Sequence, residues 1–166
     1  MKRKIYTVIS VILLVVLYAV IFGFSAQTGE ESGGLSHMVS KRLVQLADFF
    51  GTKDWMEWEI DSKAALIDLL VRKTAHFSEY AVLGFLEYGL AVLWMKKGTG
   101  RIVLTAVILF LSGALDELHQ LFVPGRYASF WDVLLDTAGG CAGMLLFSFI
   151  YRITVVRKKA AGKSDG

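Results

Sequence analysis

Ionisable and amide side chains interrupt or border the long apolar stretches of this sequence. Their types suit proton transfer, through histidine and carboxyl groups, and the binding of an anion, through lysine, arginine and amide groups. A charged side chain in the middle of a bilayer costs about 2.5–3.5 kcal/mol on insertion scales, so such residues are rare unless paired, protonated or needed. In chain order they are Gln27, Lys73, His76, Glu79, Asp116, Glu117, Gln120, Arg126, Asp132 and Asp136.

These residue types predict two sets with different roles. Adjacent carboxyl groups are a like-charge pair of the kind that retains one proton, and general acid–base catalysis needs an acid and a base with separated pKa values. We therefore predict a catalytic set that comprises His76, Glu79, Asp116 and Glu117. A substrate-binding set would hold and orient an anionic group such as a phosphate or carboxylate, and it comprises Gln27, Lys73, Gln120, Arg126, Asp132 and Asp136.

Two other interpretations of the same residues stay open. In the first, the polar side chains only hold membrane helices together, as an ion-pair network in which the carboxylates are neutralised by Arg72, Lys73, His76 and Arg126. In the second, His76-x-x-Glu79 and Asp116-x-x-His119 each place two metal ligands one helical turn apart. The chain has no His-Glu-x-x-His, P-loop or Cys-x-x-Cys motif, so we expect neither a metal nor another cofactor.

The elements that must position these residues are membrane-spanning helices. Of the 166 residues 55% are hydrophobic and only 20% are charged, and the mean hydropathy is +0.53. A bilayer core needs roughly 20 apolar residues per helix. This pattern argues against a water-soluble enzyme and predicts an all-α, polytopic protein. We expect a single domain over residues 1–166, with four spans at about 5–24, 75–95, 102–122 and 133–151.

The distribution of cations predicts how these spans are oriented. Basic residues precede the first span, fill the 96–101 loop and recur in the tail 152–166. By the positive-inside rule both termini and that loop are cytoplasmic in a multi-pass protein of the cell membrane, and the segments 25–74 and 123–131 face outward. These cations are topology determinants, so we expect no nucleic-acid partner. The first apolar run exceeds the 7–15 residues of a signal peptide's core, which favours an uncleaved span.

The long outer loop 25–74 contains helical patterns of its own. Trp55 and Trp58 suit the headgroup level, and Asp61-Ser62 predicts the N-terminus of a helix that continues into the second span. Before them, apolar residues recur at helical spacing, which predicts a short amphipathic helix in the outer interface. These residues are Leu35, Met38, Val39, Leu43, Leu46, Phe49 and Phe50.

The polar residues of different spans should meet at one depth. Successive spans run antiparallel, and at 1.5 Å of rise per residue the polar residues all fall within roughly 10 Å of one face of the membrane. Gly139 and Gly143 form a small-xxx-small surface that lets the fourth span approach its neighbours closely. We therefore predict a polar, carboxylate-rich pocket that opens to the outer leaflet.

Four motifs together resemble those of the VanZ-like family, over about residues 5–150. They are Phe24-Ser-Ala-Gln27, Arg72-Lys-Thr-Ala-His-Phe-Ser-Glu-Tyr80, Asp116-Glu-Leu-His-Gln-Leu-Phe-Val-Pro-Gly-Arg126 and Asp132-Val-Leu-Leu-Asp-Thr-Ala-Gly-Gly140. Every substrate-binding and catalytic candidate matches the family pattern except Asp136, where that pattern more often has asparagine. The resemblance implies a membrane architecture, an envelope role and lowered susceptibility to the glycopeptide teicoplanin. It names no reaction. The partners we expect are membrane lipid and a lipid-linked envelope intermediate or lipoglycopeptide.

Overall fold

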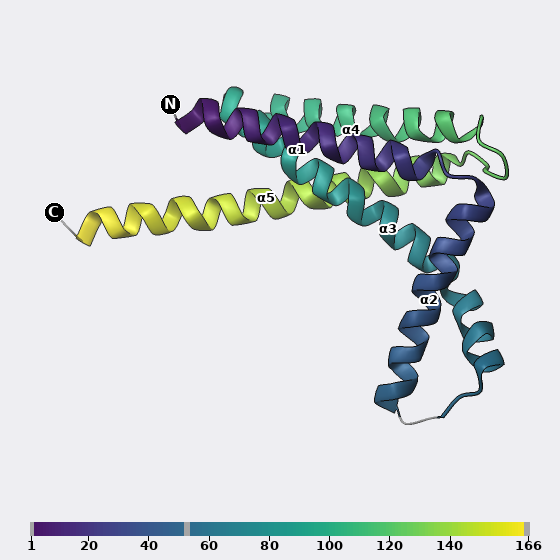
Figure 1. Ribbon diagram of the computed structural model, residues 1–166. Coiled ribbons are helices and arrows are strands. Elements are labelled where there is room, and N and C mark those ends of the chain that lie inside the picture. The colour runs from purple at the N-terminus through teal and green to yellow at the C-terminus, as the bar shows by residue number, and fades with distance from the viewer. Residues whose placement is uncertain (1, 52–53, 165–166) are drawn as a thin grey trace.

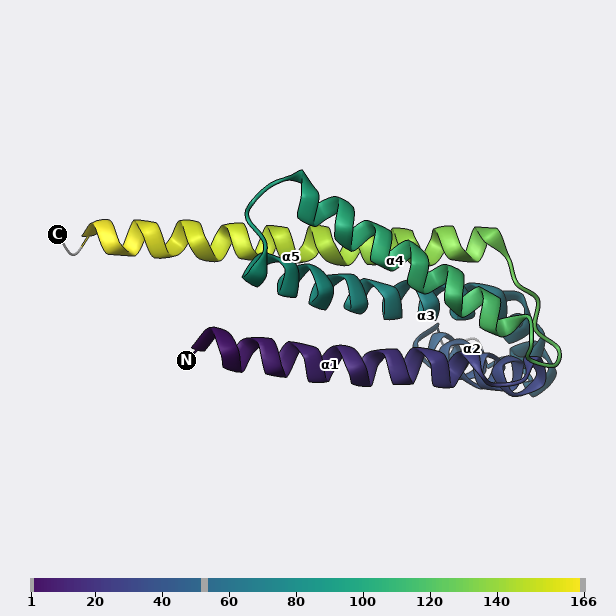
Figure 2. The same cartoon turned by 90° about the horizontal axis from the view of Figure 1, so that it is seen from above.

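The computed structural model describes residues 2–51 and 54–164, with side chains described for residues 3–51 and 54–154. Within these residues the chain is all-helical, as predicted, and contains no strand. In Figures 1 and 2, α1, α4, α5 and the second half of α3 run side by side as a bundle. The helices are α1 (Lys2–Ser25), α2 (Gly29–Gly51), α3 (Glu57–Trp94), α4 (Thr99–Gln120) and α5 (Phe130–Ser164).

Three helices are long and apolar enough to cross a membrane: Arg3–Ser25 of α1, Thr99–Gln120 of α4 and Phe130–Thr154 of α5. They correspond to three of the four predicted spans. The remaining predicted span, 75–95, is the second half of α3, where His76, Glu79 and Glu87 lower the hydropathy. That half contacts α1, α4 and α5, so it is the helix that the other three surround. This position lets α3 carry polar groups against protein rather than lipid.

Glycines set the close contact between α3 and α5. A Cβ atom at Gly139 would lie 2.3 Å from the Phe77 carbonyl oxygen, and one at Gly143 would lie 1.8 Å from that of Ala81. Across the same interface, a Cβ at Gly84 would lie 2.0 Å from the carbonyl oxygen of Gly140. The predicted small-xxx-small surface is thus confirmed: the two backbones touch where a side chain has no room.

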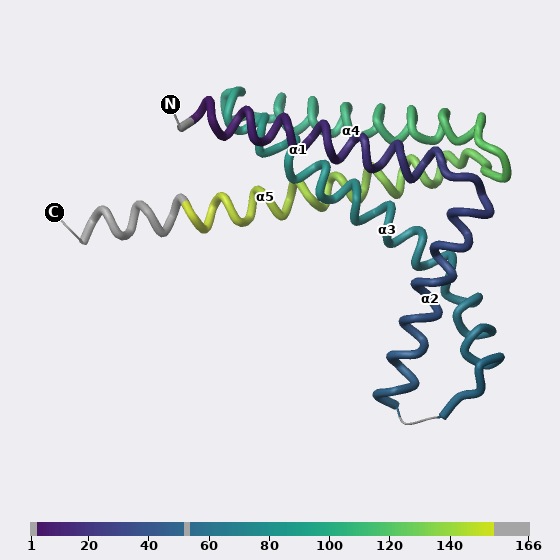
Figure 3. The backbone as a smooth tube through the Cα atoms, viewed as in Figure 1, coloured from purple at the N-terminus to yellow at the C-terminus, as the bar shows by residue number. Residues whose placement is uncertain are grey.

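The helices α2 and the first half of α3 form a hairpin that projects from the bundle, as the backbone trace in Figure 3 shows. Polar contacts lie between its two helices: His37 Nδ1 is 3.0 Å from Asp68 Oδ2, and Lys41 Nζ is 2.8 Å from Asp61 Oδ1. Val44, Ile60 and Ala64 also form a small buried apolar cluster between the two helices, but many of the large apolar side chains of the hairpin are exposed. They are Leu35, Met38, Val39, Leu43, Leu46, Phe49, Phe50, Trp58, Leu66, Leu69 and Leu70.

Several predicted boundaries are wrong. The helix expected to start at Asp61-Ser62 begins at Glu57, because the Glu59 carboxylate accepts the Met56 N–H at 2.9 Å while Asp61 pairs with Lys41. It does continue into the bundle. The amphipathic helix predicted within residues 25–74 is not short, since α2 has 23 residues. At the other end of the chain α5 runs to Ser164, so most of the expected tail 152–166 is helical; residues 165–166 and the side chains after residue 154 lie outside the described part.

Candidate functional site

A loop between α4 and α5 closes the end of the bundle at which α1 ends, opposite the end where α1 begins (Figure 1). Gly125 makes the turn with a φ of +73°, a left-handed conformation that favours glycine. The Gly29 N–H donates to the Pro124 carbonyl oxygen at 2.9 Å, and a Cβ at Gly29 would lie 2.0 Å from the Gly125 carbonyl oxygen. The loop is therefore held against the start of α2.

Arg126 joins this loop to the end of α1. Its guanidinium donates from Nη2 to the Phe24 carbonyl oxygen and from Nε to the Gln27 carbonyl oxygen, both at 3.1 Å. Partial burial, and then the nearby Arg72, lower the pKa of Arg126 below its ordinary value, but a guanidinium remains charged at neutral pH. Arg126 and Gln27 were predicted to bind substrate; the structure brings them together through the backbone of residue 27.

Carboxylates fix the start of α5 to the two helices before it. Lys73 of α3 forms an ion pair with Asp132. Glu117 Oε2, near the end of α4, accepts the Ser129 N–H at 2.7 Å. A carboxylate at the N-terminus of a helix also interacts favourably with the helix dipole. These contacts place three predicted residues, Lys73, Glu117 and Asp132, around one opening.

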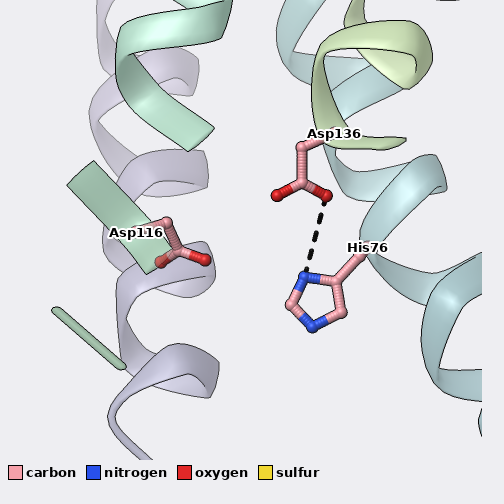
Figure 4. A group of neighbouring side chains, drawn as sticks. All are labelled: His76, Asp116 and Asp136. Atoms are coloured by element: carbon pink, nitrogen blue, oxygen red, sulfur yellow. Dashed lines mark ion pairs between the residues drawn. The ribbon is translucent and has the colours of Figure 1, made fainter. Parts of the chain in front are cut away.

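Two further carboxyl groups lie deeper, and both are completely buried. Asp116 and Asp136 have 0% exposure. Gln120 donates to Asp116 Oδ2 at 3.1 Å, and His76 Nδ1 lies 3.9 Å from Asp136 Oδ1 (Figure 4). Among the described residues, Asp116 Oδ1 and both Asp136 oxygens have no hydrogen-bond partner.

The ion-pair network considered from the sequence is present only in part. Of the four cations expected to neutralise the carboxylates, Lys73 pairs with Asp132 and His76 lies near Asp136. Arg126 instead binds backbone carbonyls. Arg72 forms no ion pair with any residue in the described part of the chain. Spacing in the sequence cannot distinguish a backbone acceptor from a carboxylate one.

Two cavities adjoin at this end of the bundle and share Arg72, His76 and Arg126 as lining residues. The polar cavity, of about 370 Å³, is lined by those three with Lys73, Glu117, Gln120 and Asp132 among others. The apolar cavity, of about 210 Å³, adds Gln27 and Glu79 to apolar residues such as Leu35, Val39 and Val71. Eight of the ten predicted residues line a cavity, and the other two are the buried Asp116 and Asp136.

Sequence reasoning missed parts of this arrangement. Arg72 lines both cavities but was assigned only to the structural network; its place one helical turn before His76 was the available signal. Tyr127, Gly29 and Gly33 also line the polar cavity, and nothing in their local sequence indicated it. Conversely His119, proposed as a metal ligand, packs edge-on against the Phe22 ring at 6.3 Å between centroids.

A bundle of long apolar helices with a polar centre near one end defines a helical membrane protein. The chain belongs to the VanZ/LLP1 family, whose model matches residues 10–151. No curated protein and no solved structure matches it.

Proposed function

We propose that this protein binds an anionic amphiphile of the cell envelope and thereby lowers susceptibility to teicoplanin-type glycopeptides. The charged head of the ligand would occupy the polar cavity, and its chain would occupy the apolar cavity. The observation that carries this proposal is Arg72, a guanidinium without an ion-pair partner in the described residues that lines both cavities. A partner of this kind is a membrane lipid, a lipid-linked envelope intermediate or a lipoglycopeptide.

The other cations of the cavity are already engaged, which leaves Arg72 for a ligand. Lys73 is paired with Asp132, and Arg126 donates to two carbonyl oxygens. A guanidinium presents a planar fork that matches the oxygens of a phosphate or carboxylate. Leu35, Val39 and Val71 of the adjoining apolar cavity offer the chain of an amphiphile an apolar surface.

The proposed topology has four spans, with the 75–95 segment of α3 as the second, and forms a single domain over residues 1–166. The cytoplasmic side carries both termini and the 96–101 loop, in accordance with the basic residues there. The cavities then open toward the outer face. The hairpin lies in the outer interface, because its exposed apolar residues would contact lipid while its ion pairs are kept between the helices.

A second candidate function is acid–base hydrolysis or transfer on a lipid-linked phosphate or glycan. It is supported by His76 and Glu117, which both line the polar cavity beside Arg72. In this mechanism Arg72 would hold the anionic group, one of His76 and Glu117 would take a proton from the attacking water or acceptor hydroxyl, and the other would protonate the leaving group. The remaining alternative is a module in which the polar residues only pack helices or bind lipid.

Antibiotic susceptibility of a sensitive Gram-positive host tests the proposal. The strains would express the wild type, Arg72→Gln, Glu117→Gln or the matched control Arg42→Gln, which alters an exposed arginine of α2. Membrane abundance is quantified in each strain. We expect the wild type and Arg42→Gln to protect against teicoplanin more than against vancomycin, and Arg72→Gln at equal abundance not to protect.

The outcomes separate the candidates. Loss of protection in Glu117→Gln at equal abundance supports the catalytic function, because the amide keeps the shape of the side chain but cannot exchange the proton. Equal protection by the wild type and Arg72→Gln would refute ligand binding by Arg72. No protection by the wild type would refute the resistance role.

A further inference from the structure

We propose that His76, Asp116 and Asp136 form a binding site for one divalent transition-metal ion. The three side chains come from α3, α4 and α5 and point toward one another, as Figure 4 shows. One ligand atom from each, an imidazole nitrogen or a carboxylate oxygen, lies within 4.8 Å of the others. This grouping differs from the two pairs that the sequence spacing suggested, because Asp136 takes the place of Glu79 and His119.

The unsatisfied oxygens of the two carboxyl groups are suited to bind a cation. Asp116 and Asp136 are both fully buried, and Asp116 Oδ1 and both oxygens of Asp136 lack a hydrogen-bond partner among the described residues. A buried polar oxygen without a partner costs free energy, and a buried unpaired charge costs much more. A metal ion between the two carboxylates would satisfy these oxygens and compensate their charge.

The surroundings hold the ligands in place, as they do in metal sites. Gln120 donates to Asp116 Oδ2, which leaves Oδ1 as the free oxygen. Gly113 of α4 adjoins Asp136 closely: a Cβ there would lie 3.4 Å from Asp136 Cβ and 3.7 Å from Oδ2. Asp116 is therefore oriented by a neighbour on its own helix, and Asp136 is packed closely against α4.

The ligand set selects the class of metal. One imidazole with two carboxylates suits Zn²⁺ or Mn²⁺ better than Ca²⁺, which takes 6–8 oxygens. Three protein ligands leave a further coordination position. His76 also lines the polar cavity, so the site adjoins the cavity in which we propose that an anionic head binds. The metal site itself does not depend on that proposed function.

Metal binding by the purified protein tests the site. The full chain in detergent is treated with chelator, equilibrated with Mn²⁺ or Zn²⁺ and freed of unbound ion. Elemental analysis then gives the bound metal, and electron spin-echo spectroscopy of the Mn²⁺ form detects a coordinated nitrogen. We expect about one ion per chain, a nitrogen coupling from His76 that is lost in His76→Gln, and at least tenfold weaker binding in Asp136→Asn.

The control variant is Glu30→Gln, which removes an exposed carboxylate of α2 that lies outside the proposed site. It should bind metal as the wild type does. Circular dichroism and gel filtration establish whether Asp136→Asn is folded. The nitrogen coupling is measured on the wild type, so it tests the site even if this variant does not fold. Wild type without bound Mn²⁺ or Zn²⁺, bound Mn²⁺ without a nitrogen coupling, or unchanged affinity in folded Asp136→Asn would each overturn the proposal.

Discussion

Substitution of Gly139 by alanine should separate α5 from α3 directly beside the buried carboxyl groups. The new Cβ would lie 2.3 Å from the Phe77 carbonyl oxygen, whereas ordinary contacts begin at 3.4 Å. Neither atom can rotate away, because the Cβ is fixed to the backbone of α5 and the oxygen belongs to the backbone of α3. The helices must therefore move apart by about an ångström. Overpacking of this kind costs about 1–3 kcal/mol, which for a chain of this length lowers the melting temperature by roughly 2–12 °C.

Gly23→Ala is the matched control, because a Cβ at Gly23 of α1 meets nothing within 4 Å. Thermal unfolding of both variants in the same detergent, followed by gel filtration, gives the comparison. Gly139→Ala should melt below the wild type, and Gly23→Ala should melt at or above it, because alanine favours a helix more than glycine does. Phe77 is the neighbour of His76 in α3, so the separation should also weaken Mn²⁺ binding in the folded variant. Equal melting temperatures for the two variants would refute the claim that backbone contact at Gly139 sets the helix spacing.

Three further predictions concern the hairpin and the end of the bundle that adjoins it. Thr28 N–H donates to the Glu31 carboxylate, which lowers the pKa of Glu31 below 4.5; this stabilisation is present above pH 4.5 and is lost as the pH falls through the lowered pKa. Hydrogen exchange of the first turn of α2, corrected for the intrinsic rate, should therefore accelerate toward pH 3 in the wild type and depend less on pH in Glu31→Gln. Phe50→Asp should weaken cross-linking of the hairpin to photoactivatable lipid, because Phe50 is 80% exposed; unchanged cross-linking would contradict an interfacial hairpin. Lys73→Met should cost under about 1 kcal/mol, since the partly exposed Lys73–Asp132 pair is screened by solvent, and a larger loss in urea or thermal unfolding would contradict that.

The sequence predicts the helices well because hydrophobic length and helical periodicity are local properties. The glycine interface between α3 and α5 was predictable for the same reason, since Gly139 and Gly143 fall on one helix face. The position of the polar residues at one end of the bundle could be predicted because successive spans were expected to run in opposite directions. The start of α3 was not predictable from a capping pattern alone, because Asp61 could equally cap a helix or pair with Lys41.

The partners of the polar residues could not be predicted, because they depend on how helices are packed. Arg126 was expected on an anion, yet it donates to carbonyl oxygens at the end of α1. Asp136 was grouped with substrate-binding residues, yet it is buried and adjoins Gly113. Identical side chains at identical spacing would give a different network if α1 ended one turn earlier.

The proposed amphiphile and the proposed metal are separable, because they depend on residues with different surroundings. Arg72 lines both cavities and is not one of the three grouped ligands, so Arg72→Gln should lose protection while it still binds Mn²⁺. Asp136 lines neither cavity and is buried, so loss of protection in folded Asp136→Asn would mean that the ion acts on the bound ligand. Persistence of protection in that variant would mean that the ion is not needed for protection, and that ligand binding alone accounts for the function.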